Sequence, residues 1–239
     1  MFRYQWTQQP QYPAQINWSN PISRNLTNSV DICGYDICAN KALSRYNGSY
    51  ATKLLKSDTA FSFDATGLLS TSVPKVTTGL TYYKTIFCNI MPTLGSTGVA
   101  VALSRPSGYD QLGVYFSGGM IYAFLRDSPG TVRSITDSVS TRSDVVTACC
   151  VTFIHRPSTL TKELKLFLDG IEVASSTWTS GELELSQLTI GASVYSFGAL
   201  PGGSLRFTGK VNSVLVWGRV LNAAEIRSVS ANPWQIFQP

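Results

Sequence analysis

Charged residues are scarce in this sequence. Only 14% of the 239 residues are Asp, Glu, Lys or Arg, against about 25% in an average soluble domain. The formal net charge of +5 is scattered, and Lys53 with Lys56 is the nearest approach to a basic cluster. This pattern does not indicate nucleic-acid binding. A surface with so few charges is expected to be covered in large part by partner subunits.

Long apolar runs are also missing. No stretch approaches the ~18 residues of a membrane helix, so we expect no membrane partner. No N-terminal segment combines a charged start with an apolar core, so we expect no secretory signal. The five cysteines are an odd number. We therefore expect reduced, mostly buried thiols in a protein made in a reducing cytosol.

Metal-ligating residues are few and separated. His155 is the only histidine, and no second Cys or His pair completes a zinc set with Cys33 and Cys38. Calcium prefers about six to eight oxygens, usually with two or more carboxylates close together. The candidate aspartates stand singly, at Asp64, Asp110, Asp127 and Asp137. We expect no metal and no cofactor.

A catalytic pattern is absent as well. The sequence has no G-x-S-x-G elbow, Gly-rich phosphate loop or H-E-x-x-H helix. A glycosidase needs two converging carboxylates, but Glu182 and Glu184 alternate with leucines, which is typical of the solvent face of a strand. His155 has no acidic partner nearby in the sequence, and we predict a sheet-edge residue rather than a catalytic base. We expect that the chain is not an enzyme.

Two hairpins are the clearest structural signals. In the first, alternating leucines lead to an Asp-Gly turn at 169–170. A two-residue turn places Leu168 opposite Ile171 and Leu166 opposite Val173. The apolar residues of both arms then share one face.

The second hairpin has Gly118-Gly119 at its turn. Tyr115 and Tyr122 pair on one face, which we leave open to solvent, a ligand or a partner. On the other face, a two-residue turn pairs six apolar residues: Phe116 with Ile121, Val114 with Ala123, and Leu112 with Leu125.

The C-terminal region predicts one helix. Asn222 and Glu225 have the spacing of a capping box, with Leu221 and Ile226 as a hydrophobic staple. Residues 145–154 are apolar on both faces, which predicts a central strand covered on both sides. Turn signals every ~8 to 12 residues predict ~12 to 14 strands and an all-β sandwich.

These motifs resemble the C-terminal half of a laminin-G-like or concanavalin A-like jelly roll, over about residues 145 to 229 and more loosely from about 25. The resemblance implies an antiparallel two-sheet jelly-roll sandwich with one short C-terminal helix, and by itself no activity. It rests on Leu166-Phe167-Leu168-Asp169-Gly170, Leu188-Thr189-Ile190-Gly191, Phe207-Thr208-Gly209-Lys210-Val211, and Val216-Trp217-Gly218-Arg219-Val220-Leu221 with Glu225-Ile226.

Both ends of the chain are similar to those of laminin-G-like proteins encoded by tailed bacteriophages. The similar segments are 16–21, leading to Asn25-Leu26, and 232–237. We divide the chain into an extended N-terminal arm (1–24), the sandwich (25–229) and a C-terminal tail (230–239).

The arm is rich in Gln, Pro and aromatics, which favours an extended or irregular segment. Large aromatic side chains need a surface to bury against, either on the sandwich itself or on another subunit. The predicted partner-binding residues of arm and tail are Phe2, Tyr4, Trp6, Tyr12, Trp18, Trp234 and Phe237. Sugar binding needs aromatic platforms in turn-rich stretches, and the candidates are Trp178, Tyr195 and Phe197, although aromatic plugs at sandwich ends have the same pattern.

The resemblance to phage proteins leads to a functional prediction. The leading hypothesis is a virion structural protein, namely a capsid decoration (cement) protein on the capsid exterior, made in the bacterial host cytoplasm. Its predicted partners are the major capsid protein and copies of itself, as a trimer or dimer. The alternative is a tail- or fibre-associated carbohydrate-binding module that recognises a surface glycan. A hydrolase is the third hypothesis.

Overall fold

The computed structural model describes residues 15–30, 35–38, 41–42, 44–46, 51–55, 58–64, 68–74, 80–105, 110–127, 131–137, 142–179, 181–192 and 206–237. Most of these residues are in strands. The strands of the first half are β1 (Leu26–Val30), β2 (Tyr35–Asp36), β3 (Lys41–Ala42), β4 (Ser44–Tyr46), β5 (Ala51–Leu55), β6 (Asp58–Asp64), β7 (Leu68–Ser72), β8 (Tyr82–Pro92) and β9 (Gly98–Ser104).

The second half adds eight strands and the described helices. The strands are β10 (Gln111–Ser117), β11 (Met120–Asp127), β12 (Thr131–Thr136), β13 (Thr147–Arg156), β14 (Thr161–Leu168), β15 (Ile171–Thr179), β16 (Gln187–Ile190) and β17 (Thr208–Trp217). The helices are η2 (Pro21–Ser23), α2 (Ala223–Ala231) and η3 (Pro233–Ile236). The strand number exceeds the ~12 to 14 expected, because several strands are only two or three residues long.

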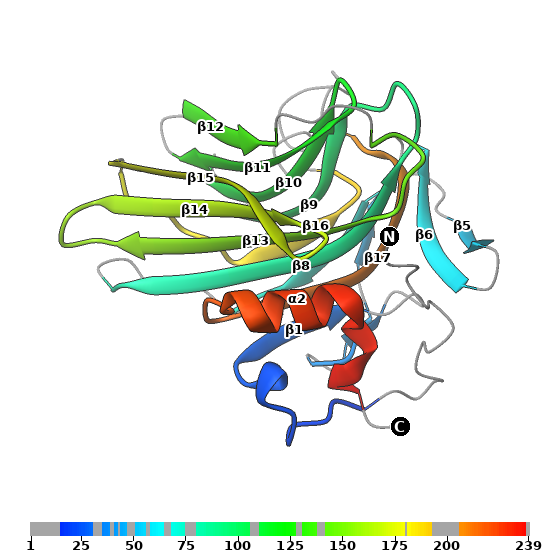
Figure 1. Cartoon of the computed structure of the whole chain (residues 1–239), viewed down its shortest axis with the longest axis horizontal. Coiled ribbons are helices and arrows are strands. Elements are labelled where there is room, and N and C mark those ends of the chain that lie inside the picture. Colours follow the sequence, from blue (N-terminus) through cyan, green and yellow to red (C-terminus); the bar gives the residue numbers. More distant parts are fainter. Residues whose placement is uncertain are drawn as a thin grey trace.

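The strands form two antiparallel sheets that pack face to face (Figure 1). One is a ten-stranded sheet in the order β15-β14-β13-β8-β17-β1-β2-β3, with β6 also paired to β17 and β5 to β6. The other is a seven-stranded sheet in the order β12-β11-β10-β9-β16-β7-β4. The predicted all-β, two-sheet jelly-roll sandwich with one short C-terminal helix is confirmed.

The main core lies between the sheets, where alternate residues of the long strands point inward, as in β10, β11, β13 and β14. At ~25 cal/mol per Å² of apolar surface, this layer supplies most of the stabilisation. The prediction that residues 145–154 form a strand covered on both faces is confirmed for 147–153, whereas Val145 lies before the strand and is 50% exposed. Cys149 and Val151 of β13 face the main core, while Ala148 and Cys150 face a second apolar cluster behind the sheet.

The β10–β11 hairpin has the predicted register at every position, and its six apolar residues are buried in the core. The β14–β15 hairpin differs after its first pair. Leu168 pairs with Ile171 as predicted, but a bulge shifts the register so that Leu166 pairs with Ala174. The predicted pairing of Leu166 with Val173 is therefore wrong. Ile171 is 66% exposed, because the bulge turns the start of β15 away from the core.

Helix α2 begins with the predicted capping box. The Asn222 side chain accepts from the backbone N–H of Glu225, and the Glu225 carboxylate accepts from the N–H of Asn222. The staple residues Leu221 and Ile226 are both buried. The helix lies against the outer face of the ten-stranded sheet, across β8 and β13 (Figure 1). This side of the sandwich is therefore closed by the chain itself.

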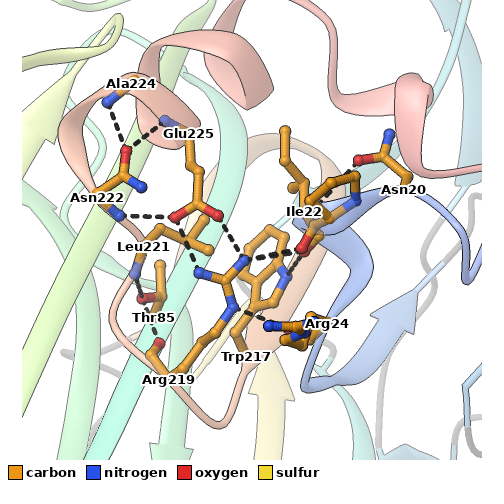
Figure 2. Close-up of polar contacts among 11 residues, drawn as sticks. Asn20, Ile22, Arg24, Thr85, Trp217, Arg219, Leu221, Asn222, Ala224 and Glu225 are labelled. Carbon is orange, nitrogen blue, oxygen red and sulfur yellow. Dashed lines mark hydrogen bonds and ion pairs between the residues drawn. The ribbon is translucent and has the colours of Figure 1, made fainter.

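Arg219 ties the helix to the N-terminal segment (Figure 2). Its guanidinium binds the Glu225 carboxylate through two hydrogen bonds of 2.8 Å each, and its Nε donates to the Arg24 carbonyl at 2.9 Å. The hydrogen bonds from Arg219 hold the pKa of Glu225 below its usual value. Beneath this pair, Trp217 Nε1 donates to the Ile22 carbonyl at 2.7 Å.

The described part of the predicted arm packs on its own sandwich, which is one of the two alternatives above. Ile16 and Ile22 are buried in the cluster beneath α2. The Asn17 N–H donates to the Ile236 carbonyl at 2.7 Å, so the segment around Asn17 lies beside the C-terminal segment around Ile236. Residues 1–14 of the arm lie outside the described residues.

Candidate functional site: a tyrosine shelf on the seven-stranded sheet

The tyrosine shelf, formed by the partly exposed Tyr115 and Tyr122 with the buried Phe124 beside them, lies on the outer face of the seven-stranded sheet. Tyr115 of β10 and Tyr122 of β11 are directly opposite one another, with ring centroids 4.9 Å apart. Phe124 meets Tyr115 edge-on at 6.4 Å. Their neighbours in sequence, Phe116 and Ile121, point inward and are fully buried. The core thus fixes the hairpin and holds the two tyrosines, which remain partly exposed, on the outside.

Small hydroxyl side chains surround the shelf. Thr136 of β12 is opposite Tyr122, and its hydroxyl donates to the Ile121 carbonyl at 2.7 Å. Ser134 is opposite Phe124 and is exposed. Among the described outward positions of β10, β11 and β12 there is no carboxylate. The shelf therefore offers apolar ring faces bordered by hydrogen-bonding groups, without negative charge.

The Tyr122 phenol is held in its neutral form. Burial in the pair raises the pKa of Tyr122, and the neighbouring Tyr115 raises it further. The Tyr122 hydroxyl contacts the Met120 sulfur at 3.9 Å, which is a weak interaction. The phenol groups can therefore donate and accept hydrogen bonds at the rim of the shelf.

Trp178, the described member of the predicted sugar-binding set, lies elsewhere. It is half-buried on β15, the terminal strand of the ten-stranded sheet, and packs against the core between the sheets. The Arg133 guanidinium lies over its ring at 5.8 Å. This placement matches the aromatic plug that the same sequence pattern also predicts. Tyr195 and Phe197 lie outside the described residues, so the set is not seen to come together.

Trp178 belongs to a polar row that crosses four strands of the ten-stranded sheet. Tyr82, His155, Lys162 and Trp178 are successive cross-strand neighbours on β8, β13, β14 and β15. The row faces the seven-stranded sheet. Phe153 on β13 and Leu164 on β14 are each two positions from a member of the row, so they share its face, and both belong to the core between the sheets. The sandwich interior is thus apolar in the middle and polar at this end.

One member of the polar row, Lys162, forms an ion pair that connects the two sheets. Lys162 is fully buried, and its Nζ lies 3.4 Å from a carboxylate oxygen of Asp127, which ends β11 and is 2% exposed. The amine also donates to the Gly181 carbonyl. Burial lowers the pKa of Lys162, and Asp127 opposes that shift.

His155 is fully buried on β13, between β8 and β14. The prediction of a sheet-edge residue is therefore wrong, because strand order cannot be read from one strand. Its ring lies 5.0 Å from that of Tyr82, and neither ring nitrogen has a hydrogen-bond partner in the structure. Burial lowers the pKa of His155, and so does Lys162. The imidazole is consequently neutral.

Each buried carboxylate of the described residues lies beside a cation. Asp137 lies 3.1 Å from Arg142, and Asp110 lies 3.8 Å from Arg105. Glu182 is exposed, while Glu184 approaches Arg105 at 3.6 Å. Across the part of the chain that the structure describes, no group of three His, Cys, Asp or Glu residues is arranged to hold a metal ion.

The described arm and tail aromatics differ in exposure. Trp18 is 62% exposed, whereas Phe237 is 7% exposed and belongs to the apolar cluster under α2. Trp234 is half-buried against Phe237, with ring centroids 6.0 Å apart. Trp18 is thus the member of the described set that is available to a partner. The other predicted residues, Phe2, Tyr4, Trp6 and Tyr12, lie outside the described residues.

Comparison with known proteins decides the family. A laminin G family model, described as the concanavalin A-like lectin/glucanases superfamily, matches residues 77–227. This chain belongs to that superfamily. The match covers the strands that carry the tyrosine shelf and the polar row. None of the curated proteins compared with this sequence matches it.

Solved structures of the superfamily fold resemble the chain at low sequence identity. Domain 4 of AbnA, a GH43 extracellular arabinanase from Geobacillus stearothermophilus solved with arabinotriose, has a TM-score of 0.62 and 11% identity, over 86% of this chain and 98% of that one. The receptor-binding domain of botulinum neurotoxin D has a TM-score of 0.64 and 10% identity, over 90% and 54%.

A third example is the binding domain of Paraclostridial Mosquitocidal Protein 1, with a TM-score of 0.60 and 11% identity, over 90% of this chain and 53% of that one. The chain thus spans about half the length of the two toxin domains. At these identities the likeness shows the shared fold. Within the described residues, no helix has the length and apolar character needed to cross a membrane.

Proposed function

We propose that this chain is a non-catalytic glycan-binding module, with Tyr115 and Tyr122 as its sugar platform. The observation that carries the proposal is the tyrosine pair itself, partly exposed on a hairpin whose opposite face is buried in the core. Two relatives support it: the arabinanase domain was solved with arabinotriose, and the neurotoxin D fragment is a receptor-binding domain.

The mechanism is stacking on a preorganised surface. One face of a pyranose or furanose ring presents C–H groups, which pack on aromatic rings, while its hydroxyls bond to polar groups at the edge. The backbone of β10 and β11 is fixed by its buried face, so little conformational entropy is lost on binding. The absence of carboxylates from the shelf favours neutral or acidic glycans over cationic ones.

Replacing Tyr122 with Ala should weaken glycan binding about tenfold or more, since a stacked aromatic ring contributes on the order of 1.4 kcal/mol. Binding is measured first on a glycan array and then by calorimetry with the best oligosaccharide. The matched control is Tyr83→Ala. Tyr83 is also an exposed strand tyrosine, 44% exposed, but it lies on the ten-stranded sheet. Equal losses in both variants, or no glycan bound by the native chain, would contradict the proposal.

Capsid decoration is a second candidate function, and the exposure of Trp18 favours it. The indole projects from a turn that is held in place: the Asn17 N–H donates to the Ile236 carbonyl, and the Asn20 side chain donates to the Gln235 carbonyl at 2.9 Å. A large apolar ring on a fixed support suits insertion into a partner, here the major capsid protein on the capsid exterior. Burial of the ring would contribute ~25 cal/mol per Å² at each copy.

Replacing Trp18 with Ala should abolish binding to capsids that lack this protein, measured by co-sedimentation. The fold should be unaffected, because the ring is mostly solvent-exposed. Leu94→Ala is the control, since Leu94 is 77% exposed and distant in sequence. Truncation of 1–24 is a poorer test, because Ile22 accepts the Trp217 hydrogen bond and belongs to the sandwich. Undiminished capsid binding by the Trp18 variant would contradict this role.

A further inference from the structure

Among the described strands, the ten-stranded sheet ends in a strand that is protected only by a bulge near its start. β15 is its terminal strand and has nine residues. Natural edge strands are kept from pairing by proline, lysine, bulges or short length. β15 contains no Pro, Lys or Arg, and Glu172, its one charge, lies at the bulge. The segment 174–179 therefore presents a regular, uncharged row of backbone groups at the edge.

The second sheet ends on the same side. β12, the terminal strand of the seven-stranded sheet, stacks over β15 and β14, while β11 stacks over β14 and β10 over β13 (Figure 1). Both free edges therefore point the same way. On β12, residues 131–134 are all exposed, and Val132 is 59% exposed. The edges of β12 and β15 therefore form one side of the sandwich.

We propose that this side pairs with a second copy of the chain, through antiparallel β15–β15 contact about a two-fold axis. A two-fold axis perpendicular to the sheet brings inner residues opposite inner ones. Because Ala174, Ser176 and Trp178 point inward and Ser175 and Thr177 point outward, the axis must pass through a residue of the strand.

We place the axis at Ser176. Ser175 then lies opposite Thr177 of the second copy, and Ala174 lies opposite Trp178 of the second copy, a small residue against a large one. An axis at Ser175 would instead pair Glu172, at the bulge, with Trp178 of the second copy and break the ladder. The pairing joins the two ten-stranded sheets into one continuous sheet.

A second copy fits this edge better than an unrelated strand. Residues 174–178, which pair about Ser176, are all uncharged, so two identical edges meet there without like-charge repulsion. Ser and Thr opposite one another on the outer face can exchange hydrogen bonds. The pairing also fits the absence of charge from 174–179, since this segment is covered in the dimer. The sequence left a trimer and a dimer open. Antiparallel pairing of identical strands has two-fold symmetry, so this geometry favours the dimer.

The register is tested with charge pairs. The variant Ser175→Glu with Thr177→Glu puts like charges opposite one another across the axis, and the dimer dissociation constant should rise at least tenfold. The variant Ser175→Glu with Thr177→Lys puts opposite charges there and should restore dimerisation. Within one chain the Glu–Lys variant is also well tolerated, because Lys165 is beside Ser175 and Glu163 is beside Thr177.

Sedimentation velocity and light scattering of the native chain and both variants, over a wide concentration range, give the dissociation constants. Thermal unfolding confirms that each variant is folded, and Ala231→Glu on the exposed end of α2 controls for added negative charge. A native chain that stays monomeric at all concentrations would overturn the proposal. A Glu–Glu variant that dimerises like the native chain would overturn it too, and a Glu–Lys variant that fails to recover would overturn the Ser176 register.

Discussion

Replacing Asp127 with Asn should lower the free energy of unfolding by about 3–5 kcal/mol, the range seen when one partner of a buried ion pair is removed. Lys162 is fully buried, and its ammonium lies 3.4 Å from the Asp127 carboxylate. Without that carboxylate a positive charge remains in the interior. The loss should be smaller at pH 10 than at pH 7, because a neutral amine needs no countercharge. Urea unfolding at both pH values measures it.

The matched control for this prediction is Asp144→Asn. Asp144 is exposed, and removing its charge should change stability by less than about 0.5 kcal/mol. A double variant, Asp127→Leu with Lys162→Met, should recover most of the lost stability, because both charges leave the interior together. A single Asp127→Asn variant as stable as the native chain would show that the pair bears little on the stability of the sandwich.

Acidification from pH 7.5 to 5 should lower the thermal midpoint by several degrees, and His155 should account for the change. It is the only histidine in the chain. Burial first, and then Lys162 on β14, lower its pKa in the folded state, while Glu182 opposes the shift; Tyr82 on β8 is neutral. The unfolded chain therefore binds more protons than the folded one. The contribution of His155 to stability is fully present above its unfolded pKa of ~6.5, and it is lost as the pH falls through its folded pKa.

Substitution of His155 by Gln should flatten this pH dependence while leaving a folded protein, because Gln is neutral throughout. Differential scanning calorimetry from pH 5 to 8 on both proteins makes the comparison. A native chain with an equally flat profile would show that His155 titrates as it does in the unfolded state. A Gln variant that keeps the full slope would assign the effect to another group.

Local patterns predicted the local structure well. The β10–β11 hairpin and the capped helix α2 follow from alternation, turn dipeptides and the Asn222–Glu225 spacing, because those contacts lie within a few residues of one another. The tyrosine pair was predicted for the same reason, with its surroundings left open. The β14–β15 register failed at the bulge, since the insertion of one extra residue depends on how the strand meets the rest of the sheet.

Strand order was beyond local patterns. His155 was predicted at an edge but lies on an interior strand, because β8, some 70 positions earlier in the chain, pairs with β13. Trp178 was predicted as a sugar-binding residue from its turn-rich surroundings in the sequence. In the structure it belongs to a polar row whose members come from four different strands. Trp18 and Phe237 were both predicted as partner-binding aromatic residues, yet Trp18 is exposed and Phe237 is buried.

The sequence by itself determined the class of fold, the hairpins, the helix and the absence of a motif for catalysis, because alternation and capping are short-range effects of backbone geometry. Only the tertiary structure decided which tyrosines form a shelf, which charges meet inside the sandwich and which strand remains at the edge. Those outcomes depend on which distant strands become neighbours, and that is set by the packing of two whole sheets.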